Sequence, residues 1–167
     1  MTDLIILANL LAGPKHGYQL KREAGTILGQ DALHNNLVYP LLRRFTKQRW
    51  VTKKSVPGER GQNRHQYALT ALGRKALIEK LSGYSESDAK SLDAFLTRVA
   101  LFHVLDAATR ERVLNVRTAH LQKLLEHLDG IKQKFPLDSY PLETVQFLQR
   151  QTEAEMVWIR HLHKISK

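Results

Sequence analysis

The spacing of hydrophobic and polar residues predicts three helices in the first fifty residues. Apolar residues recur at helical spacing over residues 4–11, and the pair Gly13-Pro14 ends this first helix. The same spacing recurs over residues 16–29. Asn35 can cap the free backbone amides of a third helix over residues 35–47. The apolar residues of that third helix share one face, and they are Val38, Leu42 and Phe45.

Two strands and a further helix are predicted next along the chain. Residues 51–56 alternate as a half-buried strand does, a Pro-Gly pair turns the chain, and residues 64–69 return. Thr70 is a suitable N-cap for a helix over residues 71–81. Helices followed by a hairpin and another helix are typical of a winged helix-turn-helix, in which the hairpin is the wing.

Charge is divided unevenly along the chain. Residues 1–81 hold 14 Lys and Arg against 5 Asp and Glu, a net charge of +9, whereas residues 82–167 hold 12 against 11, a net charge of +1. An excess confined to the half with the hairpin indicates that one domain meets a polyanion. Together with the winged-helix order, this asymmetry predicts binding to double-stranded DNA.

The outer face of the third helix carries residue types that recognise DNA. Asn can bond an adenine edge at two atoms, Arg a guanine edge or a phosphate, and Tyr a phosphate. A helix face of this kind is by itself more often an ordinary solvated surface. Its position before a basic hairpin leads us to favour DNA binding instead. Arg60 and Arg64, near the wing tip, can enter a minor groove or hold phosphates, and the sequence leaves both open. The predicted DNA-binding residues are Tyr18, Lys21, Asn35, Asn36, Tyr39, Arg43, Lys47, Lys53, Lys54, Arg60 and Arg64.

The second half of the chain has only helical patterns. The expected fold class is therefore mainly α, with a winged helix and its two-stranded wing over residues 1–82 and an all-α domain over residues 83–167. A serine-rich stretch over residues 81–91 is the expected hinge between them. A strongly apolar helix is predicted over residues 92–105, and a last helix can begin at Pro141.

Leucines every seven residues in the second half indicate a helix that needs a partner helix. The helices of this half can pack within one chain, or they can exchange faces with a second copy. We favour the second copy, because one winged helix covers only about half of a palindromic DNA site. The residues predicted to mediate dimerisation are Leu114, Leu121, Leu128, Leu148, Ile159 and Leu162.

Composition and motifs argue against other classes of protein. The chain has no cysteine, which excludes disulfides, thiolate metal sites and cysteine nucleophiles. No apolar run approaches the ~20 residues of a membrane span, and the first residues lack the basic start of a signal peptide, so a cytoplasmic protein is expected. No phosphate-binding glycine loop or GxSxG motif is present, so neither an enzyme nor a cofactor is expected. The histidine pairs are too distant, or lie on opposite helix faces, so no metal site is predicted.

Aromatic residues of the second half are the candidates for a small-molecule pocket. Such side chains offer flat apolar surface with polar tips, as ligand pockets do. An aromatic stripe at helical spacing is more often plain core, and we give core the greater weight. The candidate effector-pocket residues are Phe95, Phe102, His103, Tyr140 and Trp158.

Three segments, in this order, resemble the PadR family of transcriptional regulators. They are LLAGPKHGYQLKRE, VYPLLRRF in the third helix, and HQYALTALGRKAL after the basic hairpin. Tyr39, Pro40 and Leu42 fit the family pattern, whereas Asn36 and Leu37 replace its usual Gly and Ser or Thr. The second half is similar to the longer helical C-terminal region of the family, so the resemblance covers nearly the whole chain.

The resemblance implies a homodimer that binds an inverted-repeat operator, usually as a repressor, and is sometimes released by a small molecule such as a phenolic acid or another aromatic compound. A ligand at the junction of the two modules would change the spacing of the recognition helices. The rival interpretation is a basic architectural or RNA-binding protein without sequence preference. The base-reading residue types of the third helix and the nearly neutral second half favour the regulator.

Overall fold

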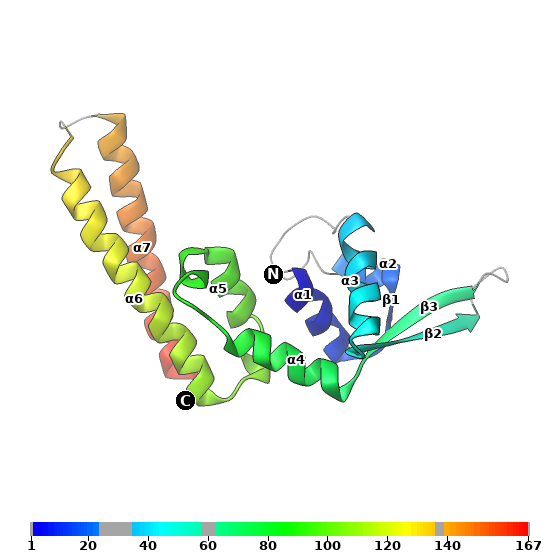
Figure 1. Ribbon diagram of the computed structural model, residues 1–167. Helices are drawn as coiled ribbons and strands as arrows, with labels where there is room; N and C mark the ends of the chain where they lie inside the picture. The colour runs from blue at the N-terminus through cyan, green and yellow to red at the C-terminus, as the bar shows by residue number, and fades with distance from the viewer. Residues whose placement is uncertain (1, 24–34, 58–62, 136–138, 167) are drawn as a thin grey trace. The chain divides into compact units, whose positions relative to one another are not determined.

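The computed structural model describes residues 2–23, 35–57, 63–135 and 139–166 (Figure 1). The chain folds into two compact units. The first holds the described residues up to Gly83 together with Asp93–Leu105, and the second holds Tyr84–Leu92 and the described residues from Asp106 onward. The expected mainly α class is confirmed, and the sheet that the described residues form belongs to the first unit.

The helices of the first unit enclose one hydrophobic core. Leu7 of the first helix, Leu20 of the second and Leu77 of the fourth are all fully buried, because each helix turns its apolar face inward. The third helix has the predicted bounds, while the expected end of the second helix lies outside the described residues. The elements are α1 (Thr2–Asn9), η1 (Leu10–Ala12), α2 (Gly17–Glu23), α3 (Asn35–Lys47) and α4 (Ala71–Ser82).

The wing is a small antiparallel sheet with the strand order β1-β3-β2. The predicted hairpin is present, with Val51 opposite Leu69 and Val56 opposite Arg64. The additional strand β1, next to β3, was not predicted, because two residues carry too little alternation to be separated from the start of a helix. The strands are β1 (Lys15–His16), β2 (Val51–Pro57) and β3 (Asn63–Leu69).

A tight junction ties the wing to α4. The backbone amide of Gly73 donates to the hydroxyl oxygen of Thr70 at 2.9 Å, which is the predicted N-cap. The Thr70 hydroxyl donates in turn to the carbonyl oxygen of Arg49 at 2.8 Å. A Cβ atom at Gly73 would lie 2.1 Å from the Trp50 carbonyl oxygen, so only glycine permits this close approach. The junction therefore fixes where the wing leaves the helical core.

The apolar stretch over residues 92–105 is not one helix. It forms α5 (Leu92–Val99) and the short turn η5 (Phe102–Val104). The buried guanidinium of Arg98 donates to the carbonyl oxygens of Leu81 at 3.3 Å and Ala94 at 3.0 Å, which ties α5 to the end of α4. This tie explains why the chain does not divide at a single point after residue 82, since α5 and η5 pack with the first unit.

The second unit is built on an antiparallel pair of long helices, α6 (Ala107–Lys132) and α7 (Tyr140–Ile165), side by side in Figure 1. Asp106 and Ser139 cap their N-termini. The short turn η4 (Asp88–Lys90) packs against α6. Leucines at seven-residue spacing supply the α6 side of the buried seam, and apolar residues of α7 supply the other. Among the residues that the structure describes, no helix is long and apolar enough to cross a membrane.

Candidate nucleic-acid interface

The helix α3 separates an apolar face from a polar one. Its inward residues Val38, Leu42 and Phe45 have no exposed surface, so the helix is seated firmly on the core. Pro40 lies inside the helix on the exposed side, where it leaves the core contacts intact. The residues of the opposite face recur every fourth position and are exposed, namely Tyr39, Arg43 and Lys47.

A hollow of about 240 Å³ lies where α2, α3, β1 and β3 meet. It brings Tyr18, Tyr39 and Arg64, all predicted to bind DNA, to one place on the surface. Tyrosine hydroxyls and an arginine around a shallow hollow are groups that can hold a phosphate oxygen. The other residues that line it are His16, Gly17, His65 and Tyr67.

Gly17 sets the distance between α2 and α3. A Cβ atom at this position would lie 2.8 Å from Cε1 and 3.3 Å from the hydroxyl oxygen of Tyr39. The absence of a side chain thus lets the Tyr39 ring lie against the start of α2. Tyr39 is 38 % exposed, so its position is fixed by packing while part of it remains accessible.

His16 organises the near side of the same hollow. Its ring stacks on the ring of Tyr18, with centroids 5.8 Å apart and planes 9° from parallel. The Nδ1 atom of His16 bonds to the carbonyl oxygen of His65 at 3.2 Å, which links β1 to β3. The backbone amide of His16 donates to the side-chain oxygen of Gln19 at 2.8 Å. These contacts hold the Tyr18 ring at the surface with half of its area exposed.

Tyr67 forms the floor of the hollow and is only 6 % exposed. Burial raises the pKa of its hydroxyl above the usual range, and the neighbouring Tyr39 adds to the rise, whereas Arg43 opposes it. The Tyr67 hydroxyl therefore stays neutral near pH 7 and keeps its proton as a hydrogen-bond donor.

The wing presents cations on both of its faces. Lys53 and Lys54 are consecutive residues of β2, and both are exposed. Because neighbouring side chains of a strand point to opposite faces, the two ammonium groups leave the hairpin on different sides. Lys21 on α2 is partly exposed. The side chains of Asn35 and Asn36 and the whole of Arg60 lie outside the described residues.

The residues predicted for an effector pocket do not form one group. Phe95 and Phe102 are buried in the core of the first unit, while His103 is exposed and lines a separate hollow of that unit. Tyr140 and Trp158 both lie on α7 but are 18 residues apart, about 27 Å along a helix. These two side chains therefore cannot hold one small molecule within a single chain.

Most residues predicted for dimerisation are buried inside one chain instead. In the structure these residues pack α6 against α7 of the same chain, which is the intrachain alternative left open by the sequence. Leu148 differs, since it remains 38 % exposed on α7. The buried residues are Leu114, Leu121, Leu128, Ile159 and Leu162.

Tyr67 and His16 are two of the lining residues of the hollow that the sequence analysis did not predict. Tyr67 occupies an inward position of an alternating strand, where the pattern indicates only core. His16 precedes Gly17 and Tyr18, a combination that the sequence analysis assigned to the start of a helix. The pairing of β1 with β3 brings them together, and such non-local pairing leaves no trace in local spacing. Among the described residues, no group of three or more His, Cys, Asp or Glu could hold a metal ion.

A basic helix seated on an apolar core, beside a basic hairpin, defines a winged-helix DNA-binding domain. Residues 6–79 match the transcriptional regulator PadR-like family. Through this domain the chain belongs to that family of transcriptional regulators, which are not enzymes. Residues 92–166 match a second family model, the virulence activator alpha C-terminal region.

Several solved structures are similar to the chain. A candidate transcriptional regulator of Thermoplasma acidophilum is 31 % identical over 47 % of this chain and 74 % of its own, with a TM-score of 0.43. PadR of Bacillus subtilis, in complex with operator DNA, is 17 % identical over 99 % of this chain and 98 % of its own, with a TM-score of 0.47. A PadR family regulator of Clostridium difficile is 21 % identical over 47 % and 81 %, with a TM-score of 0.42. No curated protein matches the chain significantly.

Proposed function

We propose that this regulator recognises a specific inverted-repeat operator by placing α3 in the major groove. The observation that carries the proposal is the sharp division of α3, in which a fully buried stripe fixes a helix whose outer face carries Arg43. An arginine on a rigid helix can bond the O6 and N7 atoms of guanine with two parallel hydrogen bonds. A firmly supported side chain reads a base edge more selectively than one on a mobile segment.

The hollow beside α3 and the wing would hold the DNA backbone. Tyr18 and Tyr39 present hydroxyls next to Arg64, which suits contact with one phosphate. Lys53 and Lys54 add charge on both sides of the wing. Contacts with phosphates fix the position and orientation of the protein but carry no sequence information. Specificity would therefore rest on α3, and overall affinity on the hollow and the wing.

A second copy of the chain would bind the second half-site of an inverted repeat. The line of α7 residues from Tyr140 to Ile165 is the surface we assign to this contact, because it carries large apolar side chains although another face of the helix already packs on α6. Tyr140 and Phe147 are seven residues apart, as are Trp158 and Ile165, so all four lie close to one line along the helix. Tyr140, Phe147 and Ile165 are 92 %, 57 % and 66 % exposed. Packing of this face against its copy would bury large side chains that a monomer leaves in water.

Binding of the dimer to its operator would repress transcription, and a small aromatic or phenolic molecule would release it. A dimer reads two half-sites about 34 Å apart, so a small change in the angle of its recognition helices weakens binding to both. Such a ligand needs only different affinities for the bound and released conformations.

The test is binding of the purified protein to its own upstream DNA and to scrambled DNA of the same length and composition. We expect a preference of about a thousandfold near physiological salt, as specific regulators have. Fluorescence anisotropy with unlabelled competitor DNA measures both affinities. Genome-wide capture of bound DNA fragments would find the operator if it lies outside the upstream DNA of the protein's own gene. Equal, strongly salt-dependent binding to all fragments would instead establish the architectural alternative.

A further inference from the structure

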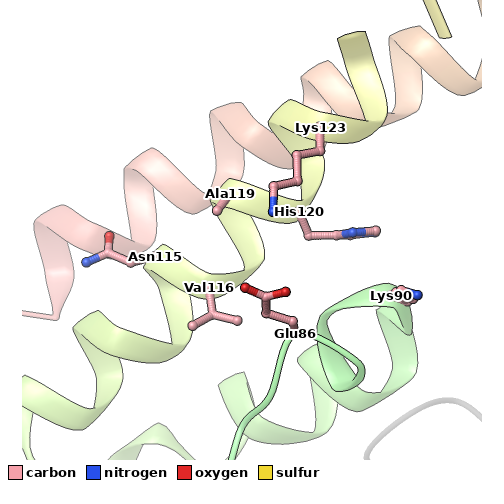
Figure 2. A pocket seen from close by; sticks show the side chains of 7 residues that line it. All are labelled: Glu86, Lys90, Asn115, Val116, Ala119, His120 and Lys123. Atoms are coloured by element: carbon pink, nitrogen blue, oxygen red, sulfur yellow. The ribbon is translucent and has the colours of Figure 1, made fainter. Parts of the chain in front are cut away.

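Apolar surface lies beside charged groups in both units of the chain. In the second unit, Val116 and Ala119 line a hollow of about 430 Å³ between α6 and the segment that contains η4 (Figure 2). In the first unit, Leu37 lies on α3 and is 49 % exposed. Leu37 bears on sequence recognition, because α3 is the helix that the proposed function places in the major groove.

The exposed side of α3 is apolar near its start and basic towards its end. Leu37 and Pro40 are three residues apart, so they are neighbours on one face, and both are exposed. Arg43, Arg44 and Lys47 follow in the second half of the helix and are exposed as well. Phosphates attract cations but offer nothing to an apolar side chain. The first turn of α3 therefore suits a different part of the DNA than its basic end does.

Arg44 continues the line of Leu37 along α3, seven residues further on, but it is engaged within the first unit. A guanidinium nitrogen of Arg44 lies 3.9 Å from a carboxylate oxygen of Asp3 in α1. The ammonium group of Lys80 in α4 approaches the same oxygen at 3.1 Å. The guanidinium carbon of Arg44 also lies 5.3 Å from the centroid of the Phe45 ring. These contacts draw Arg44 towards the rest of the unit, so Leu37 is the side chain of this line that is left for a base.

The position of Leu37 in α3 is one from which base edges are reached. It is the third residue of the helix, and the N-terminal residues of a recognition helix are the ones that contact base edges. In the major groove these edges present hydrogen-bonding atoms and one apolar group, the C5-methyl group of thymine. Apolar side chains contact this methyl group. The base 5-methylcytosine carries the same group at the same ring position, whereas cytosine lacks it.

We propose that Leu37 determines specificity by contacting the C5-methyl group of a pyrimidine in each operator half-site, a step that rests on the proposed function. The contact removes apolar surface of both the leucine and the methyl group from water. Leu37 and Arg43 are six residues apart, which is about 9 Å along an α-helix. Successive base pairs are about 3.4 Å apart. The methylated pyrimidine therefore lies within about three base pairs of the guanine proposed for Arg43.

Replacement of each operator thymine by deoxyuridine, one position at a time, tests the contact with the full-length protein. Uracil keeps the pairing and hydrogen-bonding groups of thymine and lacks only the methyl group. At one position we expect the affinity to fall about fourfold in one half-site, and about fifteenfold when both half-sites are changed, as the loss of one buried methyl-sized group predicts. Fluorescence anisotropy measures these affinities. If no replacement lowers the affinity while the operator is still preferred over scrambled DNA, the methyl contact is wrong and the proposed function stands.

Variants assign the methyl contact to a residue. Leu37→Ala should bind the thymine and uracil operators with equal affinity, because the side chain that distinguishes them is gone. Leu37→Met keeps a long apolar side chain and should still prefer thymine. Leu72→Ala is the matched control, since Leu72 is also 49 % exposed but lies on α4, and it should respond to uracil as the original protein does. Urea unfolding curves verify that all three variants are folded. A preference for thymine that persists in Leu37→Ala would overturn the assignment.

Cytosine and 5-methylcytosine at the sensitive position identify which pyrimidine supplies the methyl group. A gain of about fourfold from methylation in the original protein, absent in Leu37→Ala, would show that methylated cytosine is recognised like thymine. A gain for thymine over uracil without one for 5-methylcytosine over cytosine would assign the contact to thymine. Equal binding of all these duplexes and of scrambled DNA would overturn the methyl contact and the proposed function together.

Discussion

The helices α3 and α7 are both amphipathic, yet their surfaces are divided in opposite ways. In α3 the stripe of Val38, Leu42 and Phe45 is fully buried, and the exposed side carries Arg43 and Lys47 together with Leu37, which is 49 % exposed. In α7 one apolar stripe packs on α6, and a second line of large side chains, from Tyr140 to Ile165, is exposed except at Trp158, which is partly buried. Helix α3 thus packs its apolar stripe inside the chain and keeps a basic face for DNA. Helix α7 has apolar surface left for another protein chain. An amphipathic pattern identifies the buried face only when the helix has a single apolar stripe.

Truncation of the seam between α6 and α7 should give the largest effect. Leu121→Ala removes a side chain that is 2 % exposed, so we expect the free energy of unfolding to fall by about 2–5 kcal/mol. Leu148→Ala, at a position 38 % exposed, should cost less than about 1 kcal/mol in the monomer. Urea denaturation followed by circular dichroism measures both. A larger cost at Leu148 than at Leu121 would mean that the seam lies elsewhere in solution.

Charges on the exposed stripe of α7 should separate the dimer. Phe147→Glu combined with Ile165→Glu places carboxylates in the proposed contact, and burial of an unpaired charge costs several kcal/mol. We expect the dimer dissociation constant to rise at least about a hundredfold, an increase of about 2.7 kcal/mol. Sedimentation velocity over a dilution series gives this constant. Arg160→Glu, exposed on another side of α7, is the control and should leave the dimer intact. A double variant that still sediments as a dimer would move the interface to another surface.

The two kinds of DNA contact can be separated at the first unit. Arg43→Ala should reduce the preference for operator over scrambled DNA by about 1–3 kcal/mol, because it removes a base contact. Lys54→Ala should weaken binding to both DNAs equally, because it removes a phosphate contact. The slope of log affinity against log salt concentration should fall by about 1. Anisotropy titrations at several salt concentrations distinguish these outcomes. Equal losses on both DNAs for Arg43→Ala would contradict base reading by α3.

A small change at Gly17 tests whether the hollow positions Tyr39. Gly17→Ala adds a Cβ atom that would lie 2.8 Å from the Tyr39 ring, so the ring must leave its present rotamer. A displacement of this kind costs about 0.5–1.5 kcal/mol, and we expect DNA affinity to fall by a similar amount. Gly83→Ala is the matched control, because a Cβ atom there meets its nearest neighbour at 3.4 Å. Unchanged DNA affinity for Gly17→Ala would show that Tyr39 does not need its packed position.

Local patterns predicted most of the elements, and non-local pairing accounts for what they missed. The α3 bounds, the hairpin and the Thr70 cap all follow from spacing and capping over a few residues. The strand β1, by contrast, exists only because β3 lies beside it, and it carries His16 into the hollow beside α3. The heptad leucines correctly indicated a partner helix, but spacing alone does not distinguish a partner in the same chain from one in another.

The smallest expected effect comes from the proton on His120. Its pKa is lowered by burial and by Arg117 and Lys90, whereas an unfolded histidine titrates near about 6.5. As the pH falls below that value, the unfolded chain binds a proton that the folded chain binds less readily, so stability decreases until the folded pKa is passed. His120→Gln should remove this part of the pH dependence, while His127→Gln, exposed on the same helix, should retain it. Urea denaturation at pH 7.5 and 5.5 measures the difference. Parallel losses of stability in all three proteins would mean that neither burial nor the neighbouring cations lower the pKa of His120 in the folded chain.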